Sequence, residues 1–121
     1  MSMKINERVV GSVTILDVVG KLVLGEPSQL LKDKIDSLIA QQRTRVLLNL
    51  KHVPYIDSSG LGQLAASYGA VMKSNGALKL LSVGERNHDL LSITRLVTLF
   101  DSFESETEAL QSFSVVAPVV A

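Results

Sequence analysis

Residues 45–62 have the sequence RVLLNLKHVPYIDSSGLG, and this stretch decides the fold class. Val and Leu dominate residues 45–50, which is typical of an interior strand covered on both faces. Over residues 61–72, apolar side chains recur at i, i+3, i+4 and i+7, the spacing of an amphipathic helix. A buried strand that passes directly into such a helix predicts one βα unit of an α/β sheet.

The alternation of strands and helices continues on both sides of that stretch. β-branched and apolar runs predict strands over residues 5–10, 13–19 and 77–83, with a short edge strand over 100–103. Helical spacing predicts further helices over residues 27–41, 87–97 and 104–112. We therefore expect one α/β domain over residues 1–113, with a mixed sheet of four to five strands and about four helices. Residues 114–121 are expected to form a flexible tail.

Composition and charge exclude several classes of function. The 121 residues include no cysteine, which rules out a disulfide scaffold, a thiolate metal site and a cysteine nucleophile. Twelve Lys and Arg residues balance twelve Asp and Glu residues, so no basic excess indicates a nucleic-acid partner. No apolar run reaches the roughly 18 residues of a membrane span, and the polar residues 1–8 do not resemble a signal peptide. We therefore expect a cytoplasmic protein.

The motif Asp57-Ser58-Ser59-Gly60-Leu61-Gly62 lies where the buried strand meets the helix. A helix N-terminus has unpaired N–H groups and a partial positive charge, so it binds a phosphate or carboxylate well. Asp and Ser are also the commonest N-caps, and local chemistry alone favours capping. However, one cap needs one such residue and the motif supplies three, while its two glycines weaken the helix. This redundancy favours a functional serine hydroxyl that the glycines leave accessible to another molecule.

Asn49-Leu50, the apolar residues 53–56 and the Asp-Ser-Ser-Gly-Leu-Gly motif resemble the signature of STAS domains, more closely the bacterial anti-sigma factor antagonists. The resemblance extends from about residue 4 to residue 112 and implies a STAS-like fold. It also implies that the unphosphorylated protein binds an anti-sigma factor that is a serine kinase, and that a sigma factor is thereby released. The kinase would use ATP to phosphorylate Ser58 and end binding, and a PPM-family serine phosphatase would reset the protein.

By the same resemblance, the partner meets the residues around Ser58. The expected docking residues in this motif are Asp57, Ser59, Gly60, Leu61 and Gly62. Many antagonists carry an Asp on the docking side after the second strand, where this chain has Val23, and Glu26 is a candidate replacement. This departure leaves the identity of the partner open, whereas the phosphorylation motif is unaffected.

Other chemistry has weaker support in the sequence. A Ser-His-Asp hydrolase based on Ser58 lacks the Gly-x-Ser-x-Gly elbow, and two distant histidines do not make a metal site. A phosphate-binding Gly-x-x-x-x-Gly-Lys-Ser/Thr loop is also absent from the sequence. We therefore expect neither catalysis nor a cofactor. The alternative function is a non-enzymatic STAS scaffold or an accessory subunit of a transport complex, and the sequence leaves the oligomeric state open.

Two further charged segments are best explained as solvated surface. His88-Asp89 is predicted to be an exposed first turn of a helix, with a docking role at the same end of the sheet as Ser58 as the alternative. Residues 101–108 carry four acids and no base, so they are expected to keep one face in water.

Overall fold

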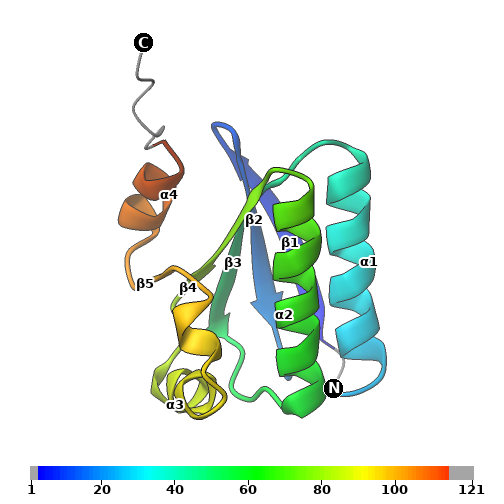
Figure 1. Cartoon of the computed structure of the whole chain (residues 1–121), viewed down its shortest axis with the longest axis vertical. Coiled ribbons are helices and arrows are strands. Elements are labelled where there is room, and N and C mark those ends of the chain that lie inside the picture. The colour runs from blue at the N-terminus through cyan, green and yellow to red at the C-terminus, as the bar shows by residue number, and fades with distance from the viewer. Residues whose placement is uncertain (1–2, 115–121) are drawn as a thin grey trace.

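A five-stranded mixed sheet forms the centre of the molecule in the computed structural model, which describes residues 3–114 (Figure 1). Its strands lie side by side in chain order: β1 (Lys4–Val10), β2 (Val13–Val19), β3 (Arg45–His52), β4 (Ala77–Leu81) and β5 (Ser102–Phe103). β1 pairs antiparallel with β2, and the other neighbouring pairs are parallel. The predicted mixed α/β sheet is confirmed.

The described residues also form four α-helices and a short 3-10 helix: α1 (Glu26–Ala40), α2 (Ser58–Lys73), α3 (Glu85–Ile93), η1 (Leu96–Thr98) and α4 (Glu106–Ser114). The predicted helix over 87–97 is too long, because Arg95 has a left-handed φ of 63° that ends the α-helical path. The last helix begins at Glu106 because the Ser105 hydroxyl accepts a hydrogen bond from the N–H of Glu108. It extends through Ser114, and residues 115–121 of the predicted tail lie outside the described residues.

The helices cover the two faces of the sheet unequally (Figure 1). Ile35 of α1, Leu64 of α2 and Leu91 of α3 belong to one large core with side chains from β2, β3 and β4. Ala109 and Phe113 of α4 form a smaller core on the other face of the same strands. Successive side chains of a strand point to opposite faces, so the near-continuous apolar strands serve both cores.

The buried face of α2 differs near its C-terminus from the apolar spacing predicted over residues 61–72, which ends at Met72. Met72 is 46% exposed, whereas Ser67 is buried and its hydroxyl accepts a hydrogen bond from Gln63. Consecutive residues of a helix are about 100° apart, so Val71 and Met72 cannot both face the sheet, and Val71 takes the inward position.

The topology places the starts of α2 and α3 next to each other. β3 and β4 are parallel neighbours, so the loops that follow them leave the same edge of the sheet. Ligands of open α/β sheets commonly bind outside this carboxyl edge. The Ser58 turn therefore lies beside the first turn of α3, as was expected for the segment around His88.

Candidate functional site

The Asp57 carboxylate organises the turn between β3 and α2. Asp57 is the N-cap of α2, and its Oδ1 accepts a hydrogen bond from the N–H of Gly60 over 2.8 Å. Its Oδ2 accepts a second bond, over 3.0 Å, from the N–H of Leu24 in the loop between β2 and α1. The capping explanation is therefore correct for Asp57, and the same carboxylate joins two loops.

The loop between β2 and α1 lies directly beside the Ser58 turn. The N–H of Leu22 donates to the carbonyl of Tyr55 over 3.0 Å, and the N–H of Asp57 donates to the carbonyl of Leu22 over 3.2 Å. Val23 follows Leu22, and Glu26 begins α1 with an exposed side chain. The structure thus places both Val23 and Glu26 in the segment that borders the motif.

The two glycines of the motif have different surroundings. Gly60 is buried, and a Cβ there would overlap the carbonyl oxygen of Leu22 and lie 2.9 Å from Cγ2 of Ile56. The packing of the chain itself therefore requires Gly60, and its role in docking stays a prediction. Gly62 is exposed, and a Cβ there would meet no atom within 4 Å. Packing does not explain Gly62, so its role in docking stays a prediction.

Ser58 is the residue of the motif whose side chain is available to another molecule. It is the first residue of α2 and is exposed, whereas Ser59 is half-buried and Leu61 is buried. Within residues 3–114 no hydrogen bond holds the Ser58 hydroxyl, because Asp57 already caps the helix. The hydroxyl thus stands free at the positive end of a 16-residue helix.

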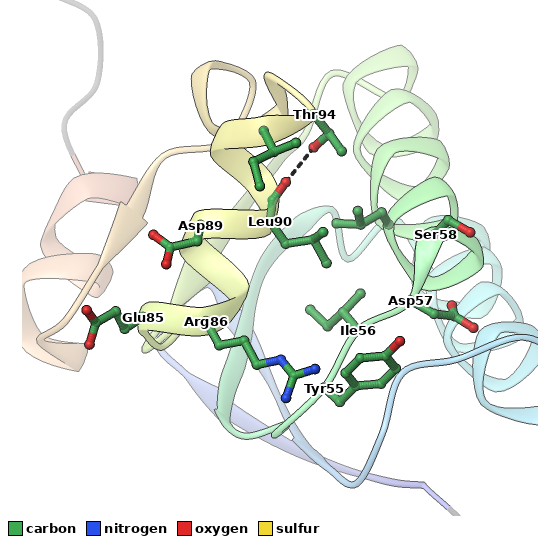
Figure 2. Close-up of a pocket in the computed structure, with 11 residues that line it drawn as sticks. Tyr55, Ile56, Asp57, Ser58, Glu85, Arg86, Asp89, Leu90 and Thr94 are labelled. Atoms are coloured by element: carbon green, nitrogen blue, oxygen red, sulfur yellow. Dashed lines mark hydrogen bonds between the residues drawn. The ribbon is translucent and has the colours of Figure 1, made fainter.

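A groove of about 800 Å³ runs between the start of α2 and α3 (Figure 2). Asp57 and Ser58 belong to its α2 side, and Ile56, Leu61 and Leu90 give it an apolar lining. Residues of α3 complete it, namely Glu85, Arg86 and Asp89, and Figure 2 shows the Glu85 and Asp89 carboxylates pointing away from the centre of the groove. Asp89 of the pair singled out in the sequence thus shares a groove with Ser58.

The first turn of α3 makes two contacts with the loop that leads to Ser58. The Arg86 guanidinium lies over the Tyr55 ring, with 4.8 Å between the guanidinium carbon and the ring centroid (Figure 2). The buried Asn87 donates from Nδ2 to the carbonyl of Val53 over 2.9 Å. The sequence analysis missed Tyr55, Arg86 and Asn87, because each pair joins segments about thirty residues apart and leaves no local pattern.

The described residues offer little that points to metal or membrane chemistry. Residues 3–114 contain no group of three His, Asp or Glu side chains placed to hold a metal ion. In the same part of the chain, every helix is too short or too polar to cross a membrane.

The hydrogen bonds to Asp57 make a testable prediction about pH. The N–H of Gly60 first, and that of Leu24 second, hold the pKa of Asp57 below its ordinary value of 3.8. A lowered pKa in the folded state stabilises the fold above the unfolded-state pKa, and this stabilisation is lost as the pH falls through the folded-state pKa. Asp57→Asn places an amide N–H₂ against one of the two N–H donors, so it should be less stable than the parent at neutral pH.

We expect this difference in stability to shrink as the pH falls below about 4, where the carboxylate of the unfolded chain begins to bind a proton, and to be lost as the pH falls through the lower pKa of the folded state. Urea denaturation of parent and Asp57→Asn at neutral pH and at about pH 2.5 measures it. Asp33→Asn, on the exposed face of α1, is the control for a generic loss of charge. An unchanged difference between the two pH values would show that the charged carboxylate does not stabilise the turn.

Comparison with known proteins identifies a family for most of the described residues. The model of the STAS domain family matches residues 4–109. The anti-sigma F factor antagonist of Paenibacillus polymyxa is 26% identical over 91 residues, which cover 74% of this chain and 78% of that protein. The anti-sigma-B factor antagonist of Bacillus subtilis (strain 168) is 38% identical over 71 residues, covering 59% of this chain and 64% of that protein.

Solved structures have the same fold. The crystal structure of a candidate anti-sigma factor antagonist from Thermotoga maritima superimposes with a TM-score of 0.84, at 25% identity, over 91% of this chain and 94% of that one. The Bacillus cell-fate determinant SpoIIAA in its phosphorylated form gives a TM-score of 0.69 at 19% identity, over 92% of this chain and 98% of that one. At that identity, the second likeness concerns the fold alone.

Proposed function

The chain belongs to the STAS domain family, and on that basis we propose that it is an anti-sigma factor antagonist switched by phosphorylation of Ser58. The free Ser58 hydroxyl, at the exposed start of α2 beside an open groove, is the observation that carries the proposal. The curated relatives are themselves anti-sigma factor antagonists, which supports the choice within the family. The cytoplasm, where sigma factors act, is the proposed location.

In the proposed cycle, the unphosphorylated protein binds an anti-sigma factor over the groove, and a sigma factor is released. The Ser58 oxygen then attacks the γ-phosphorus of ATP held by the anti-sigma factor, which acts as a serine kinase. The hydroxyl proton passes to a base of that kinase, the bond to ADP breaks, and ADP leaves. A PPM-family serine phosphatase uses water to release inorganic phosphate and restore the hydroxyl.

The local structure suits Ser58 as the phosphate acceptor. Asp57 already uses both carboxylate oxygens on backbone N–H groups, so it holds the turn in place without occupying the serine. A phosphate on Ser58 would lie at the helix N-terminus, where unpaired N–H groups and the dipole favour negative charge. The modified chain is therefore expected to keep its fold, so that the switch acts at the surface.

We expect incubation with an active cognate kinase and ATP to add one phosphate, located on Ser58 by mass spectrometry. Ser58→Ala should accept no phosphate under the same conditions, whereas Ser59→Ala should be modified like the parent, because the half-buried Ser59 is not the acceptor. A phosphate on Ser59 would refute the proposed switch at Ser58. The absence of any phosphate, while the same kinase modifies another substrate, would also refute it. Stable association with transporter subunits instead would support the scaffold hypothesis.

A further inference from the structure

Three exposed apolar side chains surround the Ser58 turn. Ile93 and Leu24 are 79% and 74% exposed, the two highest values among the large apolar side chains of the described residues, and Tyr55 is 36% exposed. Single exposed apolar residues are normal on protein surfaces and need no explanation. The arrangement around one functional serine is what calls for an explanation.

Leu24 and Ile93 approach Ser58 from opposite sides. The N–H of Leu24 is bound to the Asp57 carboxylate over 3.0 Å, so the loop between β2 and α1 presents this side chain next to the motif. Ile93 is the last residue of α3 and lines the groove that Ser58 also lines. Tyr55 lies between them, in the loop leading to Asp57, and its ring supports the Arg86 guanidinium.

The charges around the groove are predominantly acidic. Asp57, Glu85 and Asp89 line it, and Arg86 is the basic residue in its lining. The groove lining thus has an excess of two acidic residues, whereas the whole chain has a formal net charge of zero. A surface of this kind is complementary to a partner with basic side chains on the α3 side.

We propose that Leu24 and Ile93 are the two apolar anchors that determine which anti-sigma factor this protein binds. The partner presents two apolar recesses for them on either side of an uncharged centre over Ser58, with Lys or Arg side chains opposite Glu85 and Asp89. The proposal rests on the proposed function and adds the chemistry of the partner surface. Interfaces commonly draw most of their affinity from a few such residues, surrounded by contacts that exclude water.

The two anchors also explain how a phosphate on Ser58 would end binding. Their contacts would keep water out of the region between them, where the serine hydroxyl lies. A phosphate there adds about 1.5 to 2 negative charges to a surface that is already acidic, and these charges would lose their water in the complex. The basic residues of the partner, engaged with α3, are not placed to neutralise it.

The test measures the affinity of variants for the anti-sigma factors encoded in the genome of the same organism, purified one by one, by isothermal titration calorimetry. Leu24→Asp and Ile93→Asp should each weaken the complex at least about tenfold. Met72→Asp is the matched control, because Met72 is also an exposed apolar residue, on the far end of α2, about 20 Å along the helix from Ser58. It should change the affinity less than about twofold.

A second pair of variants tests the acidic residues of α3 that line the groove. Asp89→Lys should weaken binding at least about fivefold and reduce the dependence of the affinity on salt, because it opposes the basic side chains of the partner. Glu104→Lys makes the same charge change at an exposed residue between β5 and α4 and should have little effect. Circular dichroism of all variants verifies that each is folded.

The outcomes separate this inference from the proposed function. If an anti-sigma factor binds the parent and Ser58→Asp weakens that binding strongly, the proposed function is supported. If in that case Leu24→Asp and Ile93→Asp bind as tightly as Met72→Asp, the anchors are refuted while the function stands. If none of the purified anti-sigma factors binds the parent, the function and the anchors are refuted together.

Discussion

Gly60→Ala is expected to destabilise the fold by about 3 kcal/mol, the upper end of the usual range for overpacking. The added methyl group would overlap the carbonyl oxygen of Leu22, a backbone atom that cannot rotate away. Relief would require shifting Leu22, whose N–H and carbonyl both bind the chain ahead of Ser58. The cost in stability should therefore be accompanied by a disturbed Ser58 turn.

Gly62→Ala is the matched control, two residues further along the same helix. A Cβ at Gly62 would meet no atom within 4 Å, so the substitution should stabilise the fold by roughly 0.5 to 1 kcal/mol through helix propensity. Urea denaturation of the parent and both variants measures the two effects. Equal stability of Gly60→Ala and Gly62→Ala would contradict the close approach of Leu22 to α2.

The glycine pair shows where sequence reasoning succeeded and where it stopped. The local pattern correctly placed the motif at a junction between a strand and a helix, and the excess of glycine correctly indicated something besides helix stability. It could not separate Gly60 from Gly62, because the atom that needs Gly60 belongs to Leu22, thirty-eight residues earlier in the chain. Close approaches of this kind arise from tertiary packing and leave no mark in a local pattern.

The regular parts of the fold were predictable for a physical reason. Near-continuous apolar runs and apolar side chains that recur every 3.6 residues indicate which residues are buried. Whether a segment is buried depends mainly on its own side chains. The end of α3 was missed because a left-handed Arg95 has no local signature such as Gly or Asn. The groove was missed because Tyr55 and Arg86 meet only after β3 and β4 pair.

The motif could cap the helix or supply a functional hydroxyl, and the structure assigns the capping role to one residue. Asp57 is the cap, and its second oxygen holds the loop of Leu24. Ser58 does not cap the helix, so a substitution at Ser58 can test binding without removing the cap. Position 58 is therefore suitable for testing how charge at the start of α2 affects binding.

Ser58→Asp is expected to weaken the complex with the anti-sigma factor by roughly 150-fold, which corresponds to about 3 kcal/mol. An acidic residue in the first turn of a helix is favourable for the isolated domain, so thermal stability should be unchanged or higher. The loss therefore belongs to the complex, in which the carboxylate gives up water and meets a surface made for a neutral hydroxyl.

Ser58→Asn separates charge from size, because its side chain has nearly the shape of Asp without the negative charge. We expect Ser58→Asn to lose clearly less affinity than Ser58→Asp. Ser58→Ala should keep close to the affinity of the unphosphorylated parent even when active kinase and ATP are present. Calorimetric titration at low and high salt gives the measurement, and screening should reduce the difference between Asp and Asn. Equal losses for Asp and Asn would mean that steric fit at the start of α2 controls binding. Since a phosphate is both larger and more highly charged than either side chain, the Asp–Asn difference shows how much of the proposed switch is electrostatic.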